Sequence, residues 1–429
     1  MTRLRGIEPR GIERPRIAML SLHTSPLAQP GSGDAGGMNV YVWEISRRLV
    51  AAGVDVEIFT RATGHAHGDT HDLVDGVLVR HLPAGPRNGL AKEELPAQLC
   101  AMTAGILRAE SAKPAGWFDL VHSHYWLSGQ VGWVSSERWG VPLVHSMHTL
   151  ALAKNRDLRP GDTPEPRARI IGEQQVVDVA DMLVSNTEAE RWDLVSLYDA
   201  DPARTAVVHP GVDLDEFTPG DRTAARRQLG LDPNVDLLVF VGRLQPLKAP
   251  DVLLAAAAQM DRHSRPLHVV ICGGASGNGR EEPERLAALA HNLGIAEHVT
   301  FLPPLPKGQL VALFRAATAV AVPSHSETFG LVAVEAQACG APVVAADVGG
   351  LRTVVTHGES GVLVAGHNPT DWAAALEEVR TSPRLAQHLR AGSLRRASEL
   401  SWDATVAGLI DTYREALHAR RCQPLRAQA

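Results

Sequence analysis

The stretch Ala321–Gly350 reads AVPSHSETFGLVAVEAQACGAPVVAADVGG and governs the interpretation of the whole chain. The apolar run Ala319–Val322 predicts a buried strand, and a polar loop of Ser, His and Glu follows it. A short helical pattern, Gly330–Gln337, comes next and ends at a Gly and a Pro. A second apolar run, Val343–Ala346, predicts another strand. Strand, loop, helix and strand in this order indicate a parallel α/β sheet.

Two carboxylates flank the start of this helix: Glu327 lies just before it and Glu335 inside it. The first-turn N–H groups, from about Phe329 to Val332, lack intrahelical partners and would point between the carboxylates. A helix N-terminus attracts phosphate, and a carboxylate accepts hydrogen bonds from sugar hydroxyls. The local chemistry therefore suits a phosphorylated sugar. The plainer alternative is a pair of solvated helix charges.

Length and composition narrow the class of protein. A chain of 429 residues is long enough for two domains of about 200 residues each. The net charge of −6 argues against nucleic acid as a partner. No apolar run reaches the ~20 residues of a membrane span, and the basic N-terminus has no apolar signal segment. We expect a disordered tail over residues 1–15 and a cytoplasmic protein. Cys100, Cys272 and Cys339 sit in apolar runs and are predicted core thiols of a reducing compartment.

The first half of the chain alternates predicted strands and helices, which implies a mostly parallel, doubly wound sheet. The predicted strands are Arg16–Leu22, Val54–Thr60, Val77–Leu82, Asp119–Val121, Pro142–His145, Met182–Asn186 and Ala206–His209, and two helices are Met38–Ala52 and Ala168–Val179. The pattern breaks at His209-Pro210-Gly211. We therefore expect an N-terminal Rossmann-like domain over residues 16–212.

The second half repeats the alternation, and we expect a C-terminal Rossmann-like domain over residues 213–400. Its predicted strands are Leu237–Val241, His268–Cys272, Val299–Leu302, Ala319–Val322, Val343–Ala346 and Gly361–Val364, followed by helical patterns at Trp372–Val379, Pro383–Ser398 and Trp402–His418. The last helix, residues 402–418, has no strand of its own and is predicted to pack back on the first domain. The predicted fold is thus α/β, with two facing doubly wound domains and a cleft that holds ligands at the carboxyl ends of the strands.

Two cations follow a predicted strand in the segment VGRLQPLK, residues 241–248. Arg243, which can donate two parallel hydrogen bonds, and Lys248, which carries a compact positive charge, can neutralise a diphosphate. Glu327, Glu335 and the helix N-terminus are predicted on the same sheet edge and would complete a nucleotide-sugar site. A solvated charged turn is the alternative.

Gly31, Gly33 and Gly36 match G-x-G-x-x-G, but about ten residues separate the glycines from the first strand, and the second strand ends without an acid. NAD binding is therefore disfavoured, and the glycines are better suited to a close approach of backbone to a ligand.

The histidine-rich strand ends, residues 122–124 and 145–148, could suggest a metal, but no third ligand has the right spacing for zinc. Lys92, Tyr125, Thr149 and Arg169, at strand ends and helix starts, would together make a second anion site.

The Glu327-(seven residues)-Glu335 pattern, with Gly242-Arg243 and Lys248, resembles the retaining glycosyltransferases of the GT-B fold, from Arg16 to His418. The segments HTSPLAQPGSGDAGGMNVYV, GLAKEELP, HSHYWLSGQVGW, HTLALAKN, DTPEP and EQQVVDVAD further resemble the D-inositol-3-phosphate glycosyltransferases of actinobacterial mycothiol synthesis. This resemblance implies retaining transfer of N-acetylglucosamine from UDP-GlcNAc to 1D-myo-inositol 3-phosphate by a homodimer. No nucleic acid, membrane or catalytic cofactor is implied.

The resemblance also implies roles for individual residues. Arg243 and Lys248 would hold the donor diphosphate, Glu335 the ribose and Glu327 the transferred sugar. His148 would lie by the reacting carbon and complete the catalytic set. Gln29, Pro30, Gly37 and Leu305 would lie against the donor. The implied acceptor-binding residues are His23, Asp34, Ala35, Gly36, Gly37, Met38, Asn39, Lys92, Tyr125, Thr149 and Arg169.

Two positions depart from the family pattern: Ala249 stands where relatives usually carry Gly, and Leu305 where they may carry a polar residue. Family descriptions also include a magnesium ion on backbone carbonyls, which would be those of Phe314, Arg315 and Ala317. No acidic cluster supports this ion, so it would be structural at most. Three alternatives stay open: a sucrose-phosphate synthase-like enzyme, an inositol-lipid mannosyltransferase and a catalytically silent nucleotide-sugar binding protein. The lipid alternative has little support, because the helix after the Gly-rich loop offers few basic residues.

Overall fold

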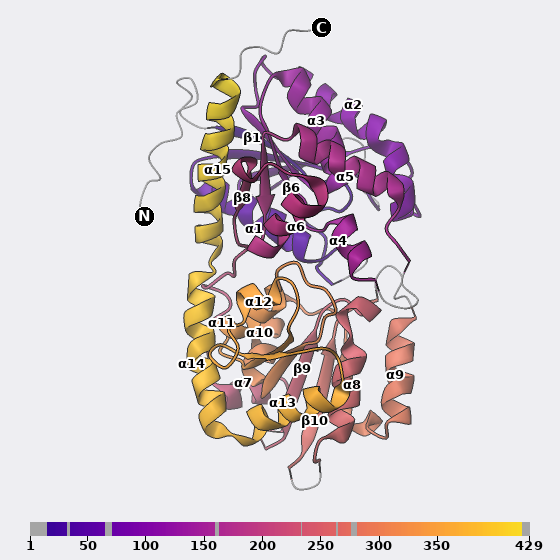
Figure 1. The fold of residues 1–429 in the computed structure, drawn as a ribbon, viewed down its shortest axis with the longest axis vertical. Coiled ribbons are helices and arrows are strands. Elements are labelled where there is room, and N and C mark those ends of the chain that lie inside the picture. The colour runs from indigo at the N-terminus through magenta and orange to yellow at the C-terminus, as the bar shows by residue number, and fades with distance from the viewer. Residues whose placement is uncertain are drawn as a thin grey trace. The chain divides into compact units, whose positions relative to one another are not determined.

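The computed structural model describes residues 15–31, 35–64, 71–158, 163–232, 234–262, 265–275 and 281–422. These residues form two compact α/β units, each with a sheet covered by helices (Figure 1). Among the described residues, the first unit contains those up to Ala28, Met38–His209 and those from Thr405 on. The second unit contains Gln29–Gly37 and Pro210–Ala404. The short Gly-rich loop therefore groups with the second unit, although it lies within the range that the sequence assigns to the first domain. The predicted N-terminal tail lies outside the described residues, except for Pro15.

The first unit contains an eight-stranded sheet in the order β3-β4-β2-β1-β5-β6-β7-β8. Its strands are β1 (Arg16–Leu20), β2 (Asp55–Arg61), β3 (His71–Val74), β4 (Val77–Leu82), β5 (Leu120–His124), β6 (Leu143–Ser146), β7 (Met182–Ser185) and β8 (Thr205–Val207). Only the β3–β4 pair of this sheet is antiparallel. The central strands are buried, and each contains apolar residues that pack in the core, although β5 and β6 end in histidine and serine.

Helices on the first sheet begin with α1 (Gly37–Ala51), whose residues Tyr41, Ile45 and Leu49 recur every four positions and are all buried. The other helical segments are η1 (Lys92–Gln98), α2 (Leu99–Ser111), α3 (Trp126–Trp139), α4 (Ala151–Arg156), α5 (Arg167–Val179), α6 (Glu188–Tyr198) and η2 (Pro202–Arg204). Most of these helices follow a strand and cross back over the sheet, so the loops at the strand carboxyl ends are the places for ligands.

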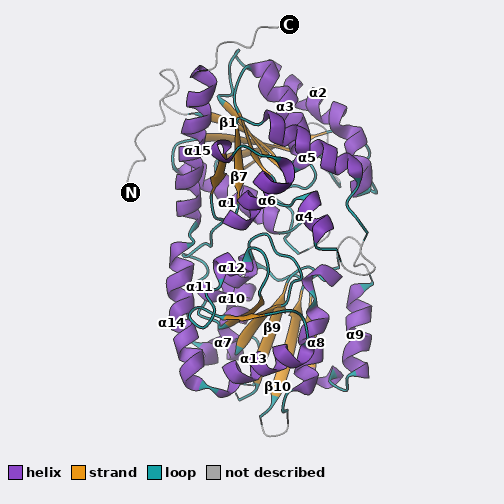
Figure 2. Cartoon of the chain, in the orientation of Figure 1, coloured by secondary structure: helices purple, strands orange, loops and turns teal. Residues whose placement is uncertain are grey.

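The second unit contains a six-stranded, fully parallel sheet in the order β11-β10-β9-β12-β13-β14, drawn in orange in Figure 2. Its strands are β9 (Asp236–Val241), β10 (Leu267–Cys272), β11 (Val299–Leu302), β12 (Ala319–Val322), β13 (Val343–Ala346) and β14 (Val362–Val364). Its helices are α7 (Arg222–Gln228), η3 (Pro246–Lys248), α8 (Pro250–Gln259), α9 (Glu282–Asn292), η5 (Ala296–His298), α10 (Lys307–Ala316), α11 (Leu331–Ala338), α12 (Leu351–Val354), α13 (Pro369–Thr381) and α14 (Pro383–Glu399). The order places β9 and β12 side by side, which brings the loops after them together.

The last helix, α15 (Trp402–Cys422), belongs to both units, because its first residues group with the second unit and the rest with the first. Thr405 Oγ1 donates to the carbonyl of His209 (2.7 Å), and the Tyr413 hydroxyl lies 2.8 Å from Nδ1 of His122 on β5. Val212 N donates to the carbonyl of Leu400 (2.9 Å) within the second unit. The terminal helix is thus part of the first unit's core.

Three features differ from the expectations or add to them. Strand β3 was not predicted, because its four residues give too short a pattern. Cys100 is exposed, so its assignment as a core thiol is wrong, whereas Cys272 and Cys339 are buried free thiols as predicted. The buried face of α2 carries Met102 and Ile106, and the helical period turns Cys100 away from it. None of the helices in the described residues combines the length and apolar character of a membrane span.

Candidate functional site

Five of the predicted acceptor residues come together at the strand carboxyl ends of the first unit. Tyr125 directly follows β5, and its ring lies close to two cations: Lys92 Nζ is 5.2 Å and Arg169 Cζ 5.1 Å from the ring centre. Arg169 Nη2 donates to the Thr149 hydroxyl at 2.8 Å. The ring of His23, beyond β1, lies 4.5 Å from that of Tyr125, centre to centre. Cations backed by an aromatic ring make a site suited to a phosphate.

Acidic residues hold the cations of this cluster in place. Arg169, which is buried, donates from Nε to Glu173 Oε1 (2.7 Å), and its Nη1 lies 2.8 Å from Glu165 Oε2. Lys154 Nζ donates to the other oxygen of Glu165 at 2.9 Å. Burial and the neighbouring Arg169 lower the pKa of Lys154, although Glu165 opposes the shift. Burial disfavours ionisation of Glu165, but Arg169 and Lys154 outweigh it and lower the pKa of this carboxyl. The cluster is therefore a cationic site with its own counter-ions.

Next to this cluster lie the two histidine-rich strand ends, which interlock in the core. The register of β5 and β6 pairs Ser123 with His145, and the Ser123 hydroxyl lies 2.7 Å from Nδ1 of His145. Nδ1 of His124 lies 2.9 Å from Nε2 of His148. Burial lowers the pKa of all four histidines, 122, 124, 145 and 148, and takes those of His145 and His148 to about 3. The imidazoles are therefore neutral hydrogen-bonding groups at neutral pH. Among the described residues, no group of side chains could hold a metal ion.

Backbone strain gathers at predicted site residues. Among the described residues, five non-glycine residues have positive φ, and they include Tyr125 (φ 70°), His148 (φ 61°) and Ala249 (φ 51°), the neighbour of Lys248. An aromatic or β-substituted residue in this region costs about 1–3 kcal/mol and persists only where the surroundings enforce it. The left-handed conformation at Ala249 also explains why Gly suits this position in relatives. Strain at such positions is typical of a functional site.

In the second unit, the loops after β9 and β12 meet through an ion pair. Lys248 Nζ donates to Glu327 Oε2 at 2.6 Å, and the Ser324 hydroxyl donates to the same oxygen at 3.2 Å. Glu327 lies four residues before the first residue of α11, and Gly330 caps the helix with φ 105°. Both charged side chains are about one-fifth exposed. The expected diphosphate cation and the expected sugar carboxylate therefore pair with each other.

Close glycine packing shapes both loops of this site. A Cβ on Gly350 would lie 2.2 Å from the carbonyl of Thr328, and Gly350 N donates to the carbonyl of Glu327 at 2.8 Å. A Cβ on Gly36 would lie 3.4 Å from Arg243 Nε, and one on Gly37 would lie 3.3 Å from Leu331. Gly36 thus packs against the side chain of Arg243, and Gly37 packs against Leu331 at the start of α11.

Comparison with known proteins identifies the family of this chain. The family described as "Glycosyl transferase 4-like domain" matches residues 36–211, and "Glycosyl transferases group 1" matches residues 221–395. A D-inositol 3-phosphate glycosyltransferase of Mycolicibacterium gilvum is 58% identical over 96% of this chain and 92% of its own. One of Gordonia bronchialis is 56% identical over 94% of this chain and 89% of its own. The chain belongs to the D-inositol 3-phosphate glycosyltransferase family. Sucrose-phosphate synthase from Thermosynechococcus elongatus, a solved structure, matches with a TM-score of 0.87 and 30% identity over 95% of this chain and all of the other.

Membership in this glycosyltransferase family confirms the predicted GT-B fold class of two parallel-sheet α/β domains.

The remaining predicted site residues are placed as follows. Gln29, Pro30 and Gly37 are exposed, Met38, Leu305 and Glu335 are half-buried, Ala35 and Asn39 are buried, and Asp34 lies outside the described residues. Asn39 Nδ2 donates to the Thr24 hydroxyl (3.0 Å) and to the carbonyl of Ser25 (2.5 Å), so it ties α1 to the loop after β1.

Sequence reasoning missed part of the charged cluster around Tyr125. Lys154, Glu165 and Glu173 were not singled out, although Lys154 lies in the quoted segment HTLALAKN and Glu165 in DTPEP. The scarcity of lysine was the usable signal, since the chain has only five lysines and two of them, Lys92 and Lys154, lie in this cluster.

The proposed magnesium carbonyls, those of Phe314, Arg315 and Ala317, lie at the carboxyl end of α10, the partially negative end of a helix. The Phe314 carbonyl already accepts from Ala317 N (3.2 Å), and Arg226 Nε donates to the neighbouring carbonyl of Ala316 (3.0 Å). A guanidinium therefore already binds the carbonyl that lies among the three, and none of the three groups is a carboxylate. These residues fit a magnesium ion poorly.

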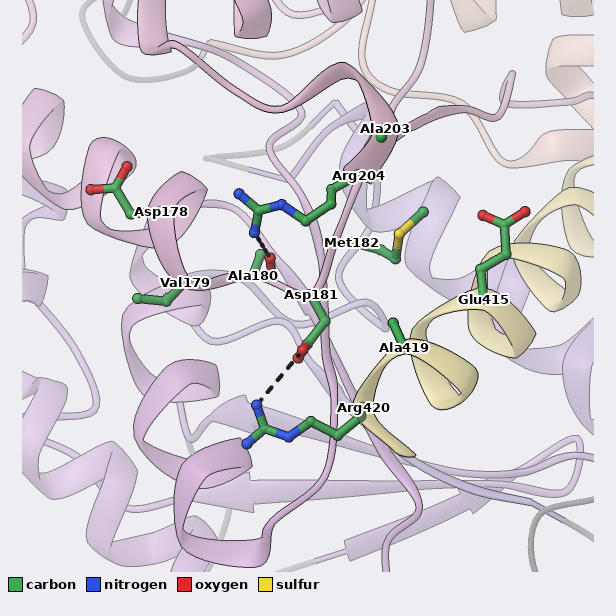
Figure 3. A pocket seen from close by; sticks show the side chains of 10 residues that line it. All are labelled: Asp178, Val179, Ala180, Asp181, Met182, Ala203, Arg204, Glu415, Ala419 and Arg420. Carbon is green, nitrogen blue, oxygen red and sulfur yellow. Dashed lines mark hydrogen bonds and ion pairs between the residues drawn. The ribbon is translucent and has the colours of Figure 1, made fainter. Parts of the chain in front are cut away.

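A separate pocket of about 210 Å³ lies at the opposite, amino-terminal end of β7, and Figure 3 shows the side chains that line it. Arg204 Nη1 donates to the carbonyl of Ala180 (2.7 Å), and Arg420 of α15 lies 3.7 Å from Asp181. None of the predicted site residues lines this pocket. It belongs to the packing of α15 and not to the candidate site.

Proposed function

We propose that this protein transfers N-acetylglucosamine from UDP-GlcNAc to 1D-myo-inositol 3-phosphate with retention of the anomeric configuration. The observation that carries the proposal is the cluster of Lys92, Lys154 and Arg169 around Tyr125. Three cations on one sheet edge suit an acceptor that carries a phosphate, and the relatives' names specify inositol 3-phosphate. The identity of the donor sugar rests on the family resemblance of the sequence.

In this proposal the second unit binds the nucleotide sugar. Arg243 and Lys248 neutralise the diphosphate, Glu335 accepts hydrogen bonds from the ribose hydroxyls, and Glu327 accepts them from the transferred sugar. Because Lys248 pairs with Glu327 in the structure, donor binding would redirect the lysine toward phosphate while the carboxylate turns to the sugar. The N–H groups at the amino end of α11 stabilise the negative charge that develops on the departing UDP.

The proposed chemistry is attack on the same face as the departing UDP, whose phosphate accepts the proton of the acceptor hydroxyl. An inverting reaction would need a side-chain base, and a double displacement would need a carboxylate nucleophile. Glu327 has its role on the sugar, and His148 is neutral because burial lowers its pKa to about 3. His148 would then bind a hydroxyl by the reacting carbon without taking up charge.

Purified protein with UDP-GlcNAc and 1D-myo-inositol 3-phosphate tests this function. We expect release of UDP and a product of the summed mass, with an α-anomeric proton signal by NMR and full activity in EDTA. A β-linked product would overturn the mechanism, and failure to release UDP would favour a silent binding protein. Because of the 30% identity to a sucrose-phosphate synthase, fructose 6-phosphate is the second acceptor to assay. Preference for it would overturn the proposed acceptor.

We also propose that the protein acts in the cytoplasm as a homodimer. The buried free thiols of Cys272 and Cys339 are consistent with a reducing compartment. The dimer follows from the family resemblance of the sequence. Light scattering coupled to gel filtration measures the mass in solution, and a monomer mass at assay concentration would contradict the dimer.

A further inference from the structure

The carboxylate of Glu165 lies between two cations of the acceptor cluster. Its Oε2 is 2.8 Å from Arg169 Nη1, and its Oε1 accepts from Lys154 Nζ at 2.9 Å. The backbone of Glu165 is anchored as well, because its N–H donates to Asn155 Oδ1 at 2.8 Å. One anionic group with two oxygens thus bridges a guanidinium and an ammonium. A phosphate group makes the same kind of bridge.

The donors of Arg169 are nearly all engaged. A guanidinium has five N–H donors. Nε donates to Glu173, Nη2 donates to both the carbonyl (3.1 Å) and the hydroxyl (2.8 Å) of Thr149, and Nη1 faces Glu165. An incoming phosphate can therefore receive a two-pronged contact from Arg169 only if one of the present partners leaves.

Glu165 is the partner of Arg169 that can leave. Glu173 is fully buried, and its Oε2 accepts from Ala151 N (2.8 Å) and from the Tyr198 hydroxyl, so its exchange would break the core. The Glu165 side chain is 24% exposed and precedes helix α5, so it can turn to solvent. The structure therefore distinguishes a fixed counter-ion from an exchangeable one.

Charge balance favours the same exchange. Lys92, Lys154 and Arg169 carry three positive charges, and Glu165 and Glu173 carry two negative ones, so the resting cluster has one net positive charge. The nearby His23 is counted as neutral. A phosphate dianion added beside Glu165 would leave one net negative charge. A dianion that replaces Glu165 leaves none, and a partly buried site is most stable when its charges cancel.

We propose that Glu165 occupies the place of the acceptor's phosphate and that acceptor binding exchanges this carboxylate for the phosphate dianion. The inference rests on the proposed function and makes Glu165 a specificity-determining residue. A neutral polyol cannot take over the charges of Lys154 and Arg169, so it leaves Glu165 in place. A phosphorylated acceptor can, and it alone obtains the Nη1 donors of Arg169 that face Glu165.

Calorimetric titration of the full chain and of Glu165→Gln tests the exchange. The three ligands are 1D-myo-inositol 3-phosphate, inorganic phosphate and unphosphorylated inositol. Since the glutamine removes a competing negative charge, we expect both phosphate ligands to bind Glu165→Gln about tenfold or more tighter, with less than a twofold change for inositol. Glu188→Gln is the matched control, because this exposed carboxylate pairs with Arg191 at the start of α6. It should leave all three affinities unchanged.

Unchanged or weaker phosphate binding by Glu165→Gln would overturn the inference, as would an equal gain for unphosphorylated inositol. Glu165→Asp, which is too short to bridge both cations, should show a gain in the same direction and guards against a misfolded glutamine variant. The experiment distinguishes failure of the proposed function from failure of the proposed exchange. Tighter binding of inorganic phosphate with no turnover of inositol 3-phosphate would support the exchange and reject that acceptor.

Discussion

Nδ1 of His124 lies 2.9 Å from Nε2 of His148, and the partner of the other His124 nitrogen decides which of the two carries the proton. Nε2 of His124 lies 2.8 Å from the sulfur of Met19, a thioether that can only accept. Nε2 therefore carries the proton of neutral His124, and Nδ1 accepts from Nε2–H of His148. It follows that Nδ1 of His148 is an acceptor, suited to a hydroxyl donor.

This proton order can be read directly by nitrogen-15 NMR of histidine-labelled protein. We expect both His124 and His148 to be neutral and protonated at Nε2. Met19→Leu keeps the apolar volume but removes the sulfur acceptor, so the protonated nitrogen of His124 should become mixed. Ser123→Ala, which removes a partner of His145 instead, is the control. An Nδ1-protonated His148 in the unaltered protein would contradict the assignment.

The buried histidines also predict a loss of stability in acid. Burial holds the pKa of His145 and His148 at about 3, below the 6.5 of an unfolded chain. Below pH 6.5 the unfolded chain takes up protons that the folded chain does not, so this stability is present above pH 6.5 and is lost as the pH falls toward 3. Each histidine should cost on the order of 2 kcal/mol of the free energy of unfolding at pH 5.

Urea denaturation at pH 7.5 and pH 5 measures this loss. His145→Gln should reduce the difference between the two pH values by about 2 kcal/mol. His388→Gln, at an exposed position on α14, should keep the full difference. An identical pH dependence in all three proteins would show that His145 does not titrate in the folded chain as described.

Loss of Lys248 should impair catalysis more than stability. Lys248→Ala removes the cation that pairs with Glu327 and that is proposed to stabilise the departing UDP, so kcat/KM should fall on the order of 10²-fold or more. Arg243→Ala should have a comparable effect. Lys307→Ala, which removes an exposed ion pair with Glu216 in the same unit, should be nearly silent. Steady-state kinetics with UDP-GlcNAc decides, and near-normal turnover in the first two variants would reject their assignment.

Lys92 should act on the acceptor phosphate alone. Lys92→Ala should raise KM for inositol 3-phosphate far more than KM for the nucleotide sugar. If Lys92 contacts the phosphate, removal of the phosphate and removal of the lysine delete the same interaction, so their effects on kcat/KM should not add. The double-mutant cycle with unphosphorylated inositol measures this coupling, and additive losses would place Lys92 elsewhere.

Gly350 should be required for the position of Glu327. A Cβ on Gly350 would lie 2.2 Å from the carbonyl of Thr328 and 2.4 Å from Phe329 Cα, both of which are backbone atoms. Gly350→Ala should therefore destabilise the fold by about 1–3 kcal/mol and weaken binding of the nucleotide sugar. Gly308→Ala is the control, because its Cβ on α10 meets nothing within 4 Å. It should stabilise the helix by up to about 1 kcal/mol, and equal Tm values for the two variants would contradict the packing.

Much of the fold was predictable because buried parallel strands appear in the sequence as short runs of apolar residues. Val343–Ala346 was predicted with the bounds that β13 has, and Ala319–Val322 with those of β12. Helix α15 was predicted four residues too short at its carboxyl end, where charged residues weaken the apolar pattern. Strand β3 escaped because four residues carry too little periodicity.

The site was predictable by residue type but not by pairing. Lys92, Tyr125, Thr149 and Arg169 do lie together, as their places at strand ends and helix starts indicated. The Lys248–Glu327 pair spans 79 residues and depends on β9 and β12 being neighbours, which no local pattern states. Glu165 carries no periodic signal at all. Its importance appears only when the donors of Arg169 are counted.

Helix α15 has a consequence for how the chain is made. One hydrogen-bond partner of His122 is Tyr413, which the ribosome adds 291 residues later, after the whole second unit. The second unit, Pro210–Ala404 with its loop, is complete in sequence before α15 emerges. Domains usually fold in the order of their synthesis. The first unit is translated first, but it cannot complete its core until α15 has been made. The second unit is translated later and is nevertheless the first that can finish folding.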